Sequence, residues 1–172
     1  IAVQGGYHEE SYGAAVDIGS TTVALYLCNL RTGELLAAES EMNPQIVYGE
    51  DVMSRIQYTI EHPGGLEKLH KAIISTLNKL LKQAAHTAKI KTSEILEMVL
   101  VGNSTMHHLL LNLPPKDLGL APFVPAIHKS VDVKARELGL HINPSGNIHV
   151  LPTIASFVGA DTSAMIVAEE PH

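Results

Sequence analysis

At residues 16–23 the sequence reads VDIGSTTV: a carboxylate ends one apolar run, and a Gly/Ser/Thr turn leads into the next. A carboxylate there can hold Mg²⁺ directly or through water, because Mg²⁺ keeps much of its hydration and binds few protein oxygens. Gly19 lets a phosphate approach the backbone, and the N–H groups and hydroxyls of Ser20 and Thr21 can donate to phosphoryl oxygens. The same residues also fit a tight hairpin whose Asp and Thr side chains only cap their own turn. Both alternatives remain open from these residues alone.

The segments around this turn predict an antiparallel meander of three strands. Residues 14–18 and 22–27 are apolar or β-forming, and a turn at residues 31–34 leads to a third strand over 35–42. Residues 1–13 hold three glycines and no apolar period, so they are expected to be a linker or leader.

The rest of the chain predicts helices that alternate with strands. Apolar spacing predicts helices over 49–61 and 66–85, a buried strand over 98–101, and a helix that Asn103 or Ser104 caps. Residues 113–147 hold five prolines and are expected to be irregular, with one short helix near 133–138. A last strand over 147–151 and a last helix over 160–169 follow. The predicted fold class is α/β, with a mixed sheet that starts with the three-strand meander.

Composition excludes several classes of protein. The 172 residues carry a net charge of −6, which gives no cationic surface for nucleic acid. No apolar run approaches the roughly 20 residues of a membrane span. The single cysteine, Cys28, lies in an apolar run and is expected to be a buried, inert thiol in a reducing cytoplasm.

Known motifs are also excluded by spacing. Neither a Gly-x-Gly-x-x-Gly nor a Gly-x-x-x-x-Gly-Lys-Ser/Thr sequence occurs among the 13 glycines. The stretch GNSTM at 102–106 lies at a strand-to-helix turn, like a hydrolase nucleophile, but Met106 replaces the second glycine. A helix cap is therefore expected there.

Two polar clusters leave alternatives open. His107 and His108 are neighbours that point about 100° apart on a helix, so one packed and one solvated ring are favoured over a metal site. Glu50, Asp51 and Arg55 are expected to form a solvated helix face with an Asp51–Arg55 ion pair, with a partner-docking surface as the alternative.

A resemblance adds to these predictions. Residues 16–23 resemble the first phosphate motif of the acetate and sugar kinase, Hsp70 and actin superfamily, whose lobes have a ribonuclease-H-like fold. Four further stretches narrow it: NPQIVYGEDVMSRI at 43–56, GNSTMHHL at 102–109, APFVP at 121–125 and LPTIASFVGAD at 151–161. Together they resemble the ATPase region of reductive activators of corrinoid-dependent methyltransferases. These are ferredoxin-like iron–sulfur proteins that restore Co(II) corrinoid to Co(I) at the expense of ATP. The resemblance covers about residues 13–168.

The resemblance implies roles for particular residues. It makes residues 14–172 the first lobe of an actin-like ATPase domain that binds ATP with Mg²⁺. Asp17 would be the catalytic carboxylate that holds Mg²⁺ through water. The turn would contact the β- and γ-phosphates through Gly19, Ser20, Thr21 and Thr22. Asp161 is a second catalytic candidate, against the alternative of an ordinary first-turn acid. Residues 102–105 and 159–162 are each expected to begin a helix after a strand, where the helix N-terminus could face an anion across the interlobe cleft.

The resemblance also implies partners and missing parts. A corrinoid protein is the expected partner, and a homodimer is a further candidate. Family members carry an N-terminal [2Fe–2S] domain and a second lobe, but this chain has one cysteine and only 11 residues after Asp161. We therefore expect an isolated segment that does not turn over ATP efficiently alone. The alternatives are a small-metabolite kinase of the same superfamily and a non-hydrolysing module that binds a corrinoid protein.

Overall fold

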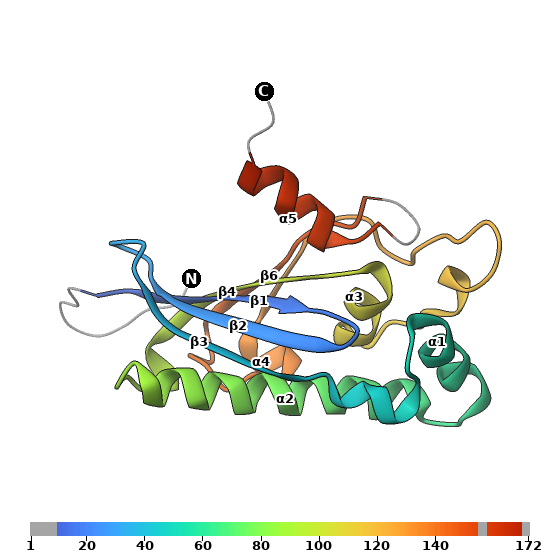
Figure 1. Ribbon diagram of the computed structural model, residues 1–172, viewed down its shortest axis with the longest axis horizontal. Coiled ribbons are helices and arrows are strands. Elements are labelled where there is room, and N and C mark those ends of the chain that lie inside the picture. Colours follow the sequence, from blue (N-terminus) through green and yellow to red (C-terminus); the bar gives the residue numbers. More distant parts are fainter. Residues whose placement is uncertain (1–9, 155–157, 170–172) are drawn as a thin grey trace.

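A six-stranded mixed sheet organises the chain. The structure is a computed structural model that describes residues 10–154 and 158–169 (Figure 1). The strand order is β3-β2-β1-β4-β6-β5. Strands β1 (Tyr12–Ile18), β2 (Thr22–Asn29) and β3 (Leu35–Met42) form an antiparallel meander. Strands β4 (Ile95–Gly102) and β6 (Asn147–Val150) run parallel to β1, and β5 (Val131–Lys134) pairs antiparallel with β6 at the edge.

Helices of very different lengths connect the strands. The long helix is α2 (Gly65–Thr87), which follows α1 (Val52–Glu61). The other helices are short: 3₁₀ turns η1 (Pro44–Tyr48), η2 (Thr92–Glu94) and η3 (Lys116–Leu118), and α-helices α3 (Ser104–Leu110), α4 (Ala135–Leu138) and α5 (Ala160–Glu169).

Helix α2 covers one face of the sheet, and α5 lies on the opposite side (Figure 1). The buried stripe of α2 includes Leu69, Ile73 and Leu77, whose three- and four-residue spacing places them on one helical face. The alternate residues Val23, Leu25 and Leu27 of β2 are fully buried, because successive strand residues face opposite sides of the sheet. Burying each such aliphatic side chain stabilises the fold by about 1.5–3 kcal/mol.

The structure confirms the α/β fold class, a ribonuclease-H-like lobe that starts with the three-strand meander. It also confirms the helix over 160–169. The helix expected over 49–61 begins only at Val52, because Asp51 adopts extended backbone and caps it. The strand β5 was not predicted: its four residues, inside a proline-rich segment, are too few to establish an alternating pattern.

Cys28 is only partly buried, so the predicted buried thiol is wrong. Its neighbours Leu27 and Asn29 are buried, and the alternation of β2 places Cys28 on the face away from α2. Within the described ranges, no helix has the length and apolar character needed to cross a membrane.

Candidate functional site

The VDIGSTTV stretch lies where β1 and β4 end side by side. These strands are parallel and in register from Ala14 opposite Met98 to Ile18 opposite Gly102, so their carboxyl ends meet at one edge of the sheet. In open α/β sheets this edge is where ligands bind. The turn at residues 19–21 leaves β1 there, and α3 begins directly after β4.

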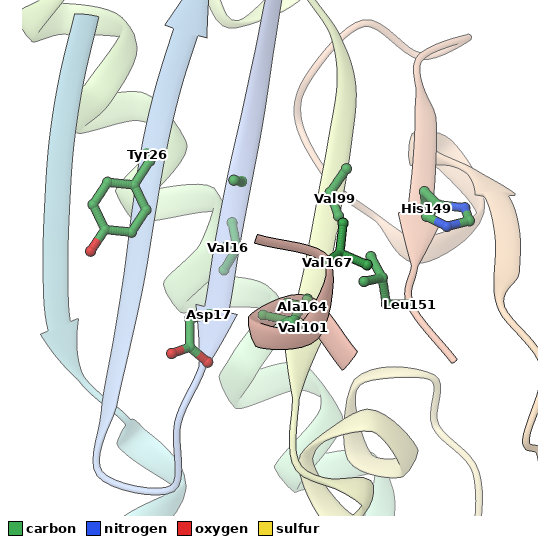
Figure 2. Close-up of a pocket in the computed structure, with 10 residues that line it drawn as sticks. Val16, Asp17, Tyr26, Val99, Val101, His149, Leu151, Ala164 and Val167 are labelled. Atoms are coloured by element: carbon green, nitrogen blue, oxygen red, sulfur yellow. The ribbon is translucent and has the colours of Figure 1, made fainter. Parts of the chain in front are cut away.

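Asp17 lies on the sheet face that α5 covers. A cavity of about 480 Å³ separates α5 from this face, and Asp17, Tyr26, Val101 and Val167 are among its lining residues. Figure 2 shows the Asp17 carboxylate at the end of β1, next to the first turns of α5. Most of the other lining side chains are aliphatic, so the carboxylate has an apolar surrounding on one side.

The structure brings Asp161 close to Asp17. Partial burial raises the pKa of Asp17, and the negative charge of Asp161 raises it further. Asp161 also behaves as an ordinary first-turn acid, because its Oδ1 accepts from the Thr162 N–H at 2.8 Å. Both roles that the sequence left open for Asp161 are therefore compatible with its position.

The turn itself is closed by its backbone. The Gly19 N–H donates to the Thr22 carbonyl at 2.9 Å, and a Cβ at Gly19 would lie 2.6 Å from that oxygen, so glycine is required. Among the described residues, the side chains of Asp17, Ser20, Thr21 and Thr22 make no hydrogen bond. The alternative in which they cap their own turn therefore finds no support, and these polar groups remain available to a ligand.

Arg55 contradicts the prediction of a solvated face. Its side chain is fully buried, and its Nη2 donates to the Ser20 carbonyl at 2.6 Å. Asp51 does not pair with it: Asp51 caps α1 by accepting from the Ser54 N–H at 2.7 Å, and the bonds from Ser54 lower the pKa of Asp51. An i,i+4 spacing predicts an ion pair only on an exposed helix face, and Arg55 points inward.

Asn43 and Gln45 lie in the same buried cluster as Arg55. The sequence analysis assigned no role to either residue. Asn43 donates from Nδ2 to the Gly19 carbonyl at 2.8 Å, and Gln45 donates from Nε2 to the Leu69 carbonyl of α2 at 2.9 Å. The signal was present in the sequence, because Asn followed by Pro is typical of an N-cap and first helical position. What it could not reveal is that the cap reaches the turn after β1.

Helix α3 is capped as predicted, by Asn103, whose Oδ1 accepts from the Met106 N–H at 3.0 Å. The expectation of one packed and one solvated histidine is wrong, because His107 and His108 are both buried. His108 has partners on both ring nitrogens: the Ser104 carbonyl at 2.7 Å and the Ala126 N–H at 2.9 Å. The short helix is enclosed on every side, which a helical spacing argument does not anticipate.

His107 differs from its neighbour. Neither ring nitrogen has a hydrogen-bond partner among the described residues, and the same holds for the hydroxyls of Ser104 and Thr105. Burial, and then His108, lower the pKa of His107 to about 4, so the ring is neutral at pH 7. The described part of the chain holds no group of three or more potential metal ligands around these rings.

The start of α5 packs directly on the β4–α3 turn. A Cβ at Gly159 would lie 2.4 Å from the Asn103 Cα and 2.4 Å from the Gly102 carbonyl oxygen. Helix α5 does not follow a strand immediately, because residues 151–159 separate it from β6. The structure thus brings together Asp17, the turn, Asn103 and Asp161, while His107 and His108 belong to the packed interior of α3.

Comparisons with known proteins agree with the resemblance read from the motifs. Residues 12–172 match the family described as the RACo middle region. The chain is 44% identical over 156 residues to the corrinoid activation enzyme RamQ of Eubacterium limosum, covering 91% of this chain and 26% of RamQ. It is also similar to the solved structure of a reductive activator for corrinoid, iron–sulfur protein, with a TM-score of 0.93 and 38% identity. That match covers 96% of this chain and 26% of the other.

The chain therefore spans about a quarter of the length of these relatives. The family match extends over nearly all of the described residues, from the first residue of β1 to the end of α5. On the strength of that match and of 44% identity to RamQ, the chain belongs to the RACo middle region family.

Proposed function

We propose that this chain is the phosphate-binding lobe of an ATP-dependent reductive activator that restores Co(II) corrinoid to Co(I) on a partner protein. The observation that carries the proposal is the turn after β1, whose Ser20, Thr21 and Thr22 hydroxyls are unpaired among the described residues beside Asp17. The likeness to two activators of corrinoid proteins supports the choice of reaction. The proposal places this reaction in the reducing cytoplasm.

The turn would bind the β- and γ-phosphates of ATP. The Ser20 and Thr21 amides make no hydrogen bond within the turn, and amides and hydroxyls together suit phosphoryl oxygens. Gly19 allows close approach because no side chain stands between its backbone and the ligand.

A magnesium ion fits the neighbouring carboxylates. The negative charge of Asp161 helps to raise the pKa of Asp17, so a divalent cation would relieve an unfavourable interaction that the protein already contains. Asp17 would hold the ion, directly or through water, and Asp161 would add charge to the site. The ion would neutralise charge on the phosphoryl oxygens during transfer.

The iron–sulfur centre of such an activator does not fit this chain. A [2Fe–2S] cluster needs four ligands, most often cysteine thiolates, and the sequence holds Cys28 alone. The proposal therefore assigns the cluster, the second lobe and the adenosine pocket to other parts of a longer protein.

The proposed reaction couples two balanced steps. ATP and water give ADP and phosphate, and one electron from an external donor, passed through the iron–sulfur domain, reduces Co(II) to Co(I). Hydrolysis would drive a closure of the lobes that gates the electron transfer. This chain contributes the phosphate contacts, not the electron path.

The test measures corrinoid reduction by the protein as its gene encodes it. The protein, an electron donor and a Co(II) corrinoid protein are mixed with and without Mg-ATP, and Co(I) is followed by its absorbance. We expect Co(I) to accumulate only with ATP. Equal Co(I) without ATP would contradict the proposal, and a phosphorylated metabolite formed from ATP would indicate a kinase instead.

A further inference from the structure

The turn after β1 is held from behind by its carbonyl groups. Gly19 receives a hydrogen bond from Asn43 Nδ2 at 2.8 Å, Ser20 from Arg55 Nη2 at 2.6 Å, and Thr21 from the Asn43 backbone N–H at 2.8 Å. Three consecutive carbonyls are thus bound by two residues. Asn43 and Arg55, together with Gln45, are called the carbonyl clamp below.

Binding the carbonyls fixes the direction of the amides. In a trans peptide unit the C=O and the N–H point in opposite directions. The Gly19 and Ser20 carbonyls share their peptide units with the N–H groups of Ser20 and Thr21. Because the clamp holds these carbonyls toward the interior, the two amides face away from it, and neither is used in the turn.

Arg55 is an unusual choice for an interior residue. Its guanidinium is fully buried, and within the described ranges no carboxylate lies within ion-pair distance of it. Its other donors go to the Gly49 carbonyl at 2.9 Å, to Gln45 Oε1 at 3.4 Å and to Met106 Sδ at 3.3 Å. A buried charge is costly unless something compensates it. An anion on the far side of the turn would provide that compensation.

The clamp is anchored in the helical layer. Gln45 donates to the Leu69 carbonyl of α2, Arg55 belongs to α1, and Met106 belongs to α3. The position of the turn is therefore set by three helices as well as by the hairpin itself. A hairpin that served only to connect β1 and β2 would not need such support.

We propose that Asn43 and Arg55 are positioning residues, which hold the turn by its carbonyls and so present the Ser20 and Thr21 amides to the phosphates of a nucleotide. This inference rests on the proposed function, because it names the residues that shape the same site. Arg55 also contributes its positive charge behind the turn. Neither residue touches the nucleotide.

The test compares nucleotide affinities in the protein as its gene encodes it. Arg55→Lys keeps the charge but loses the forked geometry, and Arg55→Gln loses both. Arg31→Gln is the matched control, because the Arg31 side chain is exposed and lies at the opposite end of β2. Calorimetry gives the dissociation constants for Mg-ATP and for adenosine, which lacks phosphates.

The positioning role predicts a loss confined to the phosphates. Both Arg55 variants should bind Mg-ATP about 10-fold or more weakly, which is the effect of losing one hydrogen bond from a turn amide to a charged phosphate. Their affinity for adenosine should be unchanged. Arg31→Gln should bind both ligands as the unsubstituted protein does. If the Arg55 variants bind Mg-ATP normally while Asp17→Ala does not, the inference fails and the proposed function stands. If the unsubstituted protein does not bind Mg-ATP, both fail.

Arg55 is buried, so its variants can lose the fold, which circular dichroism and the Tm would reveal. Hydrogen exchange on the unsubstituted protein then decides. We expect Mg-ATP to slow exchange in residues 43–56 together with residues 16–23, because the clamp and the turn open as one unit. Slower exchange in residues 16–23 alone would overturn the inference.

Discussion

The position of Asp17 sets the stability of the fold against the binding of a cation. Partial burial and the charge of Asp161 raise its pKa, so the folded protein holds the proton more tightly than the unfolded chain does. Stability therefore falls as the pH rises through the folded pKa, and the ionised form is the less stable one. The proposed cation site would tolerate this cost, because the ionised carboxylate is the form that would bind the metal.

Arg55 shows where reasoning from the sequence reaches its limit. The glycine, serine, threonine and aspartate of the turn could be identified because each residue type has a local purpose. Arg55 could not, because its hydrogen bond to the turn goes to the Ser20 carbonyl, 35 residues away along the chain. Only the fold brings α1 behind the turn.

His107 gives a prediction at the scale of a single residue. Its pKa of about 4 lies below the ordinary value of 6.5, so the unfolded chain binds a proton between these values and the folded chain does not. Stability is therefore complete above pH 6.5 and falls as the pH drops toward 4, by on the order of 3 kcal/mol in total. His107→Leu should flatten this dependence in urea unfolding measured from pH 7 to pH 4.

His141→Leu serves as the control, because His141 is exposed. The dependence of stability on pH in the His141→Leu variant should match that of the unsubstituted protein. An unchanged slope in His107→Leu would contradict the assignment of the buried neutral ring. His108, whose pKa burial also lowers, contributes to the slope that remains.

At the scale of elements, long periodic segments were predictable and short ones were not. The meander and α2 follow from strand alternation and a helical stripe that extend over many residues. Strand β5 has four residues and exists because β6 offers an edge to pair with. The packing of α5 on the β4–α3 turn depends on a single glycine, which no periodicity records.

Gly159→Ala tests that packing. The added Cβ would lie 2.4 Å from the Gly102 carbonyl oxygen and from the Asn103 Cα, and these backbone atoms cannot move aside as the end of a flexible side chain can. We expect α5 to shift, the unfolding free energy to fall by about 1–3 kcal/mol, and the pKa of Asp17 measured by NMR to move down toward 3.8 as Asp161 moves away.

Met165→Ala is the matched control on α5, because Met165 is 66% exposed and is not among the residues that line the cavity beside Asp17. It should leave both the stability and the Asp17 pKa nearly unchanged. If Gly159→Ala also leaves them unchanged, α5 does not depend on this contact and Asp161 is not held beside Asp17 by it.

At the scale of the whole molecule, the chain corresponds to about a quarter of the length of the relatives that it matches. It spans 26% of RamQ and belongs to a family named for a middle region. Its sequence could predict the three-strand meander and the turn because both are encoded locally. Three features became visible only in the fold. They are the clamp behind the turn, the enclosure of α3, and the position of Asp161 within electrostatic reach of Asp17.

The most direct test of the central claim is calorimetric titration of Mg-ATP into the protein as its gene encodes it, at pH 7.5. Asp17→Asn keeps the size of the side chain but removes its charge, and Asp117→Asn is the control, because Asp117 is an exposed carboxylate in η3. If Asp17 holds the cation beside the phosphates, Asp17→Asn should weaken Mg-ATP binding by about 10-fold or more, the loss of a charge-assisted contact, while Asp117→Asn binds normally. Equal affinity in all three proteins would contradict the account.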